Sequence, residues 1–405
     1  MVTQRDRSTQ TAPSLHILMS TGEVSGDLQG SLLIQALYRQ AKSLGCSLQI
    51  SAVGGHRMAK AGAHLIGDTT AIGSVGLLEA IPFLFPTLKM QRQIRQYLQQ
   101  KPADLVIFID YMNPNLHLGQ FLRKTYPTLA TAYYIVPQQW VWTFSEKETQ
   151  ALVEISDKMV AIFPQEAEYY RKFGADIRYF GHPLVDKLAS PPSRLEAREA
   201  LGLDSKEPII TLLPASRWQE VKYVLPILLA VAQEIQKTLP EIQFLVPISM
   251  DKLRPKIADA IAESGIRAQL IEGQGQAAIA AADLVLNKSG TVNLEVALMK
   301  VPQIVVYRLN PLTARIAYYL LNCRVDHISP VNLFVNKTIV PEFIQWEATV
   351  DAITAASLNL LEDTDARAKM LASYDELRDC MGQPGVCDQV AANLLSFALQ
   401  PVGVS

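Results

Sequence analysis

Two carboxylates in the first half of the sequence stand where acid–base chemistry could be carried out. Asp110 directly follows residues 105–109, an apolar run typical of a buried strand. A carboxylate at the end of a buried parallel strand can serve as a general base, because partial burial raises its pKa toward neutrality. An aspartate that caps the following helix fits the same residues equally well. Glu23, in the loop after an earlier apolar run, is the next candidate for the base.

Residues 284–299 in the second half have a pattern suited to a nucleoside diphosphate. An apolar run is followed by a polar turn and a helical pattern. Unpaired N–H groups at a helix start attract anions, so Ser289, Gly290 and Thr291 form a candidate phosphate seat. Glu295 could accept hydrogen bonds from ribose hydroxyls, and Arg217, at another strand end, could clamp a phosphate. An ordinary capped helix explains the 289–295 pattern equally well.

The elements that position these residues alternate between strand and helix in both halves. A Pro/Ser-rich connector at 188–194 marks a domain boundary. We therefore expect an α/β protein with two doubly wound, Rossmann-like domains, 1–187 and 188–375, and a C-terminal helical tail, 376–405. The predicted strands are 15–19, 50–53, 105–109, 132–136, 159–163 and 177–180 in the first half, and 209–213, 243–247, 268–271, 284–286 and 303–307 in the second.

Composition narrows the class of protein. The 405 residues are 49% hydrophobic and carry a net charge of −2, with no dense block of Lys and Arg, so nucleic acid is not an expected partner. The four cysteines have no metal-binding spacing, which predicts reduced thiols in a cytoplasmic protein. The first apolar run, 15–19, is too short for a signal peptide or a membrane span.

An apolar stretch at 71–88 contains Leu77, Leu78 and Phe83 and is followed by Lys89, Arg92 and Arg95. Two prolines and a glutamate make it a poor spanning helix. Burial in the core is the usual use of such a stretch. Exposed beside basic residues, it would instead suit contact with a membrane or an acylated substrate.

Two further patterns carry less weight. Trp140 and Trp142 lie on one side of an extended segment, where they could stack on a sugar ring or fill the core. Asp363-Thr364-Asp365 matches a metal-binding DxD pattern, but the polar sequence around it is typical of a surface connection between helices.

Nine short motifs occur along the chain in an order that resembles the lipid-A-disaccharide synthases. Each motif alone is weak, but nine collinear motifs from about His16 to the last helices form a specific signature. They are TGEVSGD (21–27), VGGHRM (53–58), SVGLLEAI (74–81), YIVPQQWVW (134–142), FGHPLVD (180–186), LLPASRWQEV (212–221), SGTVNLE (289–295), VVYR (305–308) and SPVNLF (329–334).

The resemblance implies a GT-B glycosyltransferase with two domains facing a cleft. Its reaction would join UDP-2,3-diacylglucosamine to 2,3-diacylglucosamine 1-phosphate with inversion and release UDP, without a metal or cofactor. The acceptor would bind the amino-terminal domain, near Gly22 and Ser25, at the inner face of a membrane. A homodimer is compatible with the resemblance. The implied roles are base for Asp110, diphosphate contact for Arg217, and nucleotide contact for Ser289, Gly290, Thr291, Glu295 and Asn332.

The chain departs from the family pattern at three places. Ala215 replaces a glycine, Tyr111-Met112-Asn113 replaces Ala-Pro-Asp after Asp110, and Thr143 replaces an arginine. An added Cβ is unfavourable if the loop at Ala215 needs a positive φ. Two alternatives therefore stay open: a UDP-sugar 2-epimerase or glycosyltransferase with other substrates, and a membrane-associated nucleotide-binding protein without catalysis.

Overall fold

The computed structural model describes residues 13–22, 24–69, 84–143, 145–204, 206–215, 217–248, 250–320 and 325–400. Two compact units are present. The amino-terminal unit contains the described residues up to Phe180 together with 385–400, and the carboxyl-terminal unit contains 181–384. The expected division at 187/188 therefore lies seven residues too late, and the tail expected at 376–405 is divided between the units. The reason for the second difference is packing, because the last helix contacts the first helix of the chain.

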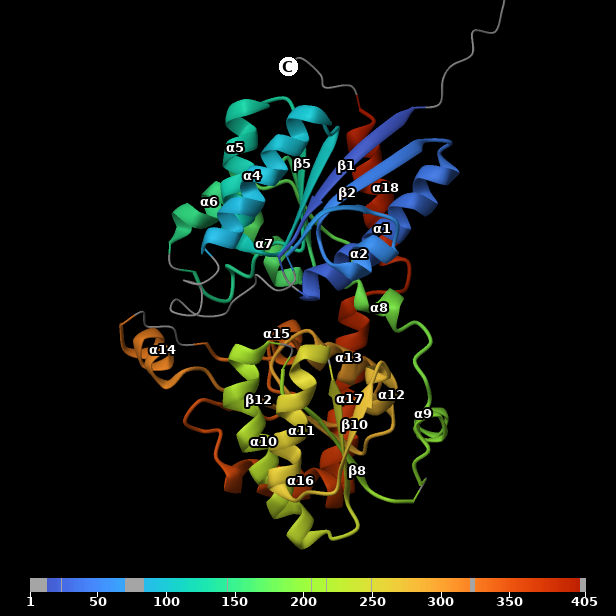
Figure 1. Cartoon of the computed structure of the whole chain (residues 1–405), viewed down its shortest axis with the longest axis vertical. Helices are drawn as coiled ribbons and strands as arrows, with labels where there is room; N and C mark the ends of the chain where they lie inside the picture. Colours follow the sequence, from blue (N-terminus) through green and yellow to red (C-terminus); the bar gives the residue numbers. More distant parts are fainter. Residues whose placement is uncertain are drawn as a thin grey trace, which may run out of the picture. The chain divides into compact units, whose positions relative to one another are not determined.

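The amino-terminal unit is built on a seven-stranded parallel sheet in the order β3-β2-β1-β4-β5-β6-β7 (Figure 1). Its central strands are fully buried because their residues are almost all apolar, as in Leu105–Ile109. The strands are β1 (Ser14–Ser20), β2 (Ser47–Gly54), β3 (His64–Asp68), β4 (Leu105–Ile109), β5 (Ala130–Tyr134), β6 (Lys158–Ala161) and β7 (Ile177–Tyr179).

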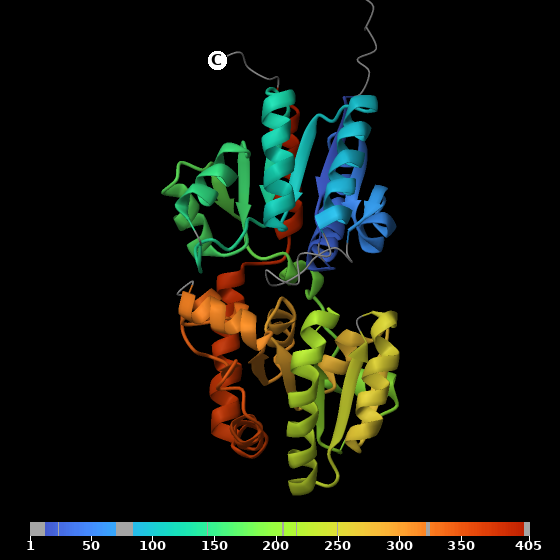
Figure 2. The same ribbon diagram turned by 60° about the vertical axis from the view of Figure 1, so that its left-hand side comes forward.

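Helices cover both faces of this sheet. Parallel crossovers are right-handed, so the helices after β1 and β2 lie on one face and those after β3 to β6 on the other. The last helix, α18 (Val386–Ala398), packs beside α1 (Figures 1 and 2). Between these two helices, Arg39 donates two hydrogen bonds to the carboxylate of Asp388. The other helices are α1 (Val24–Ser43), α2 (His56–Lys60), α4 (Leu84–Gln100), α5 (Met112–Thr125), α6 (Glu146–Glu154) and α7 (Pro164–Arg171).

The carboxyl-terminal unit has a six-stranded parallel sheet in the order β10-β9-β8-β11-β12-β13. The strands are β8 (Ile209–Leu213), β9 (Gln243–Ile248), β10 (Ala268–Glu272), β11 (Leu284–Lys288), β12 (Gln303–Tyr307) and β13 (Glu342–Ile344). The α-helices are α8 (Leu184–Lys187), α9 (Arg194–Leu201), α10 (Trp218–Thr238), α11 (Arg254–Ser264), α12 (Gly275–Ala280), α13 (Val292–Leu298), α14 (Pro311–Arg315), α15 (Pro330–Val335), α16 (Val350–Glu362) and α17 (Thr364–Met381). The predicted pair of doubly wound sheets is confirmed.

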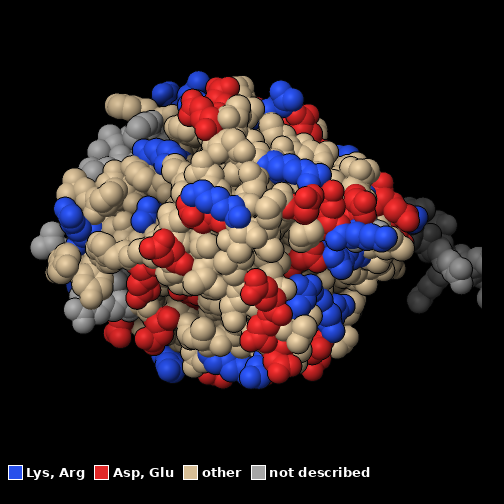
Figure 3. Space-filling view, turned by 90° about the horizontal axis from the view of Figure 1, so that it is seen from below, with Lys and Arg blue, Asp and Glu red and all other residues tan. Residues whose placement is uncertain are grey.

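The surface carries charges of both signs. Acidic and basic side chains are interspersed on the face shown in Figure 3, in keeping with the net charge of −2. Within the described ranges, no helix combines the length and the apolar character needed to cross a membrane. On α4, Phe85 and Leu88 are exposed beside Lys89 and Arg92. Leu77, Leu78 and Phe83 of the predicted apolar stretch lie outside the described residues.

A buried arginine stabilises the carboxyl-terminal unit. Arg198 on α9 is 1% exposed and donates to the carbonyl oxygens of Ala281, Asp204 and Glu207. Its Nη2 also lies 2.9 Å from the carboxylate of Asp283, which accepts the backbone N–H of Ile209 at the start of β8. One guanidinium therefore joins α9, the end of α12 and the first strand of the sheet.

Replacing Arg198 with methionine should lower the free energy of unfolding of this unit by about 3 kcal/mol or more, because Asp283 and three carbonyl groups lose a buried partner. Arg194→Met is the matched control, since Arg194 pairs with the same Asp283 but is half exposed. Arg194→Met should lower the free energy of unfolding by less than about 1 kcal/mol. Urea unfolding followed by circular dichroism measures both, and equal effects would contradict the assignment.

Candidate active site

The candidate residues lie at one structural position in each unit, the point where the strand order reverses. In the amino-terminal unit, β1 and β4 are neighbours there, and they lead into Gly22 and Asp110. In the carboxyl-terminal unit, β8 and β11 are neighbours there, and they lead towards Arg217 and Ser289. Ligands of open α/β sheets bind outside the carboxyl ends of the strands at such points.

Asp110 lies in a strained turn. It is half-buried, and both Asp110 and Tyr111 have a positive φ, 45° and 52°, which is uncommon for residues other than glycine. Asn115, fully buried on α5, holds this turn: its Nδ2 donates to the carbonyl oxygens of Asp110 and Ile109, and its Oδ1 accepts from Ser20. Strain of this kind concentrates at functional sites. Sequence reasoning missed Asn115, although its place five residues after Asp110 on the next helix was a usable signal.

Tyr111 lies directly on Gly22. A Cβ built on Gly22 would come within 2.1 Å of the Tyr111 ring, so only glycine leaves room for the ring in this position. Ser25 is half-buried in the first turn of α1, and Glu23 lies outside the described residues. Tyr111, the aromatic residue that replaces alanine after Asp110, therefore covers the loop that follows β1.

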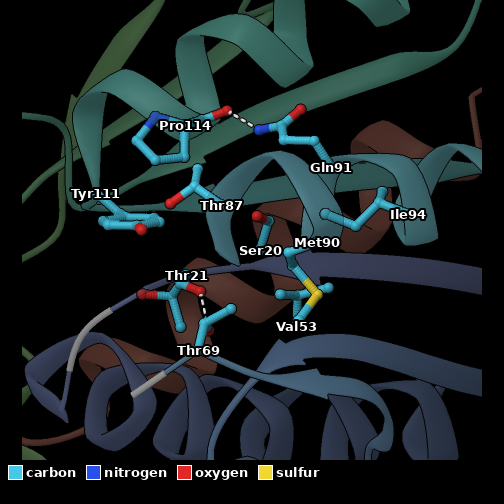
Figure 4. A pocket seen from close by; sticks show the side chains of 10 residues that line it. All are labelled: Ser20, Thr21, Val53, Thr69, Thr87, Met90, Gln91, Ile94, Tyr111 and Pro114. Atoms are coloured by element: carbon cyan, nitrogen blue, oxygen red, sulfur yellow. Dashed lines mark hydrogen bonds between the residues drawn. The ribbon is translucent and has the colours of Figure 1, made fainter. Parts of the chain in front are cut away.

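A small hollow lies beside Tyr111 (Figure 4). Its volume is about 20 Å³, room for one water molecule. Tyr111 and Thr87 lie on one side of it and Thr21 and Thr69 on the other. Gln91 also lines it and donates to the carbonyl oxygen of Pro114. Thr21 Oγ1 and Gln91 Oε1 are buried and make no hydrogen bond to described residues. The hollow is a small recess at the switch point, and its lining combines these polar groups with apolar side chains such as Val53, Met90 and Ile94.

Asp27 joins two of the sequence motifs. Its carboxylate is 4% exposed and accepts the backbone N–H groups of Gly55, Arg57 and Met58, at the start of α2. The loops after β1 and β2 are therefore tied together. This aspartate has a structural function at a helix start.

Glu166 is a fully buried carboxyl that sequence reasoning missed. It accepts the backbone N–H of Ile162 at 2.9 Å and that of Phe163, at the start of α7. Burial raises its pKa well above the usual 4.5, and the nearby charge of Asp110 raises it further. Trp140 packs against Phe163, with ring centroids 5.6 Å apart, so this tryptophan is used in packing. Trp142 is half-buried.

The predicted phosphate seat is partly occupied by the protein's own groups. The Gly290 N–H donates to Asn293 Oδ1, and the Ser289 hydroxyl donates to the carbonyl oxygen of Ile328. Asn293 in turn donates to the carbonyl oxygen of Lys288. The turn is rigid as a result, and α13, which follows it, has only seven residues. Thr291 is half-buried at its N-cap.

Glu295 and Asn332 have different surroundings. Glu295 is 9% exposed and accepts from the Lys187 ammonium at 2.6 Å. Asn332 is fully buried; its Oδ1 accepts from the N–H groups of Ile339 and Val340, and its Nδ2 donates to Val340 and Glu342. All four hydrogen-bonding positions of Asn332 are therefore used within the protein. Glu295 remains the better placed of the two to reach a ligand.

Arg217 is the N-cap residue of α10 and is 16% exposed. Its Nη1 lies 3.7 Å from Glu220 Oε1, and the Lys288 Nζ lies 2.8 Å from the same oxygen. Sequence reasoning did not single out Glu220 or Lys288. Ala215 has a φ of 155°, a conformation otherwise nearly confined to glycine, so the predicted strain at this replacement is present.

The DxD pattern has a capping function. Asp363 is the N-cap of α17 and accepts the backbone N–H groups of Asp365 and Ala366. In the part of the chain that the structure describes, no three His, Cys, Asp or Glu side chains are grouped to hold a metal ion.

A comparison with family models and a comparison with individual proteins agree with each other. Residues 17–393 match the family described as lipid-A-disaccharide synthetase. The chain is 47% identical to a lipid-A-disaccharide synthase of Synechocystis sp. over 386 residues, covering 95% of this chain and 98% of the relative. It is 48% identical to another from Gloeothece citriformis over 383 residues, covering 95% and 100%.

Solved structures with a similar fold are more distant in sequence. The UDP-GlcNAc 2-epimerase from Neisseria meningitidis bound to UDP-GlcNAc has a TM-score of 0.65 at 12% identity, covering 95% of this chain and all of that chain. The glycotransferase of kitacinnamycin has a TM-score of 0.63 at 14% identity, covering 96% and 100%. These likenesses show the two-domain GT-B type of fold.

Glu166→Gln should stabilise the protein relative to the parent increasingly as pH rises above 4.5. Folding raises the pKa of Glu166, so the folded state keeps a proton that the unfolded state releases, and stability falls as pH rises. Glutamine keeps an oxygen acceptor and does not titrate. Urea unfolding at a series of pH values measures the difference. Glu168→Gln, exposed on the same helix, is the control, and a pH-independent difference for Glu166→Gln would contradict the prediction.

Proposed function

The chain belongs to the lipid-A-disaccharide synthetase family, glycosyltransferases of lipid A biosynthesis, and on this premise we propose its substrates and mechanism. The donor is UDP-2,3-diacylglucosamine, the acceptor is 2,3-diacylglucosamine 1-phosphate, and the products are a β-1,6-linked disaccharide 1-phosphate and UDP. The observation that supports this proposal most strongly is the 47% and 48% sequence identity to two lipid-A-disaccharide synthases over 95% of the chain. Asp110 and Arg217 at the two switch points support it.

In the proposed reaction, Asp110 takes the proton of the acceptor 6-hydroxyl as its oxygen attacks the anomeric carbon of the donor. The new C–O bond forms on the face opposite the leaving group, so the configuration inverts. The bond from the anomeric carbon to the diphosphate breaks, and its electron pair leaves with UDP. A positioned general base and a cationic group at the leaving diphosphate are the two aids that such a displacement needs.

The two units have separate tasks in this proposal. The amino-terminal unit binds the acceptor around the loop at Gly22 and Ser25. The carboxyl-terminal unit binds UDP, with Arg217 on the diphosphate, the turn Ser289–Thr291 beside it, and Glu295 on the ribose. Lys187 orients the Glu295 carboxylate through its 2.6 Å contact, which leaves the second oxygen for a hydroxyl group. Asn332 supports this site by fixing the loop at 339–340.

Incubation of the purified protein with UDP-2,3-diacylglucosamine and 2,3-diacylglucosamine 1-phosphate tests the proposal. Mass spectrometry should show a disaccharide 1-phosphate in amounts equal to the UDP released. A 2-epimerised UDP-sugar formed without acceptor would replace this proposal with an epimerase. Binding of UDP without any turnover would indicate a non-catalytic homologue.

Asp110→Asn should reduce turnover by roughly a hundredfold or more while UDP affinity stays near that of the parent, because the amide keeps the shape but cannot take a proton. Initial rates and calorimetric titration with UDP measure the two quantities. Asp176→Asn, a half-exposed aspartate of the same unit, is the control. A rate close to that of the parent would mean that the base is elsewhere, with Glu23 next to be tested.

We also propose that the amino-terminal unit binds the inner face of a membrane through α4. Phe85 and Leu88 are 84% and 65% exposed, beside the exposed Lys89 and Arg92. Apolar side chains next to basic ones bind anionic bilayers by partial insertion and by attraction worth about 1 kcal/mol per basic residue. Acylated substrates would reach the site from this surface.

Sedimentation with anionic liposomes at low and high salt tests this attachment. The parent should sediment at low salt and be partly released at high salt, whereas Phe85→Ser/Leu88→Ser should stay in the supernatant. Leu44→Ser removes another exposed leucine of the same unit and should behave like the parent. Membrane binding through this surface would be ruled out if the parent never sediments with the liposomes, or if the double variant sediments as well as the parent.

A further inference from the structure

A second cation lies beside Arg217 at the carboxyl edge of the sheet in the carboxyl-terminal unit. Lys288 is the last residue of β11, and Arg217 precedes α10, which follows β8. Because β8 and β11 are hydrogen-bonded neighbours, the side chains of Lys288 and Arg217 lie on the same part of this sheet edge. Both approach one oxygen, Glu220 Oε1, at 2.8 Å for Lys288 Nζ and 3.7 Å for Arg217 Nη1.

Two cations of this triad converge on one carboxylate. The side chains of Lys288, Glu220 and Arg217 are 16%, 5% and 16% exposed. Electrostatic interactions are stronger at such partly buried positions than in water, so an anion is favoured there. Glu220 Oε1 makes no aligned hydrogen bond within the described ranges, so its contact with Lys288 is an ion pair. An ammonium group has three donors, so the contact with Glu220 leaves others that a ligand can use.

Lys288 is fixed relative to the turn at 289–291. Its carbonyl oxygen accepts from Asn293, which also accepts the Gly290 N–H, and its ammonium lies 5.2 Å from the centre of the Tyr307 ring. The Ser289 hydroxyl is also engaged, with Ile328. A phosphate at this turn therefore finds the Gly290 N–H and the Ser289 hydroxyl already used, and it would gain from further donors nearby. Lys288 is the cation placed to supply them.

We propose that Lys288 binds the diphosphate of the nucleotide together with Arg217, and that Glu220 positions both cations. This inference rests on the proposed function, in which the carboxyl-terminal unit binds UDP. The ligand class is a nucleoside diphosphate, whose charge exceeds what Arg217 alone neutralises. Lys288 contacts the ligand and is a binding residue, whereas Glu220 acts through its two partners.

Binding of UDP and of uridine by the full chain tests the role of Lys288, with calorimetry for UDP and ligand-observed NMR for the weaker nucleoside. Lys288→Met keeps the length of the side chain and removes the charge. It should weaken UDP binding roughly ten- to a hundredfold, the scale of one charge-assisted contact, and leave uridine binding unchanged. Lys288→Arg keeps the charge and should restore most of the UDP affinity.

Lys237→Met is the matched control, because Lys237 is also ion-paired but lies in the last turn of α10, far from Glu220 in the first. The affinity of the Lys237→Met variant for UDP should equal that of the parent. If Lys288→Met does not fold, Lys288→Gln takes its place in the same titrations.

The outcomes separate this inference from the proposed function. A parent that does not bind UDP contradicts the proposed function and this inference with it. A parent that binds UDP, with Lys288→Met unchanged, overturns the role of Lys288 alone. Equal loss of UDP and uridine binding in Lys288→Met would assign Lys288 a structural function instead.

Discussion

The reversal of strand order in each sheet is the constraint on which the rest of the structure depends. Right-handed crossovers place the helices after β1 and β2 on the face of their sheet opposite the helices after β3 and β4, and the helices after β8 and β9 on the face opposite those after β10 and β11. The carboxyl ends of β1 and β4, and of β8 and β11, are therefore left without a covering helix. Gly22, Asp110, Arg217 and Ser289 all follow these four strands, so the topology itself gathers the candidate site residues in each unit.

Buried polar side chains then fix the loops that leave these strands. Asn115 satisfies the backbone carbonyls of the strained turn at Asp110, Asp27 satisfies three N–H groups at the start of α2, and Asn293 closes the turn at Gly290. Buried backbone groups without a partner are costly, so these loops have few alternative conformations. These contacts place the half-buried carboxylate of Asp110 at a defined position before any ligand binds.

The fold alone does not decide the reaction. A UDP-GlcNAc 2-epimerase and a glycosyltransferase share the architecture at 12% and 14% identity. Such folds support several chemistries, and the difference lies in the residues at the strand ends. Here the long, collinear similarity to lipid-A-disaccharide synthases identifies the family, while the ring of Tyr111 covers Gly22 at the switch point of the amino-terminal unit.

The sequence by itself determined the α/β class, the two sheets, the strands at 105–109, 209–213 and 303–307, and the placing of Asp110 and Arg217 after strand ends. Buried strands are continuous apolar runs, so their signal is local. The edge strands β3 and β13 were missed because their residues are only half-buried or exposed and lack this signal.

Only the tertiary structure decided which distant side chains meet. The contact of α18 with α1, the support of Asp110 by Asn115, and the convergence of Lys288 and Arg217 on Glu220 all depend on strand order and packing. Periodicity reports which residues are buried but not what they are buried against. Partners far apart in the sequence are chosen by the fold as a whole.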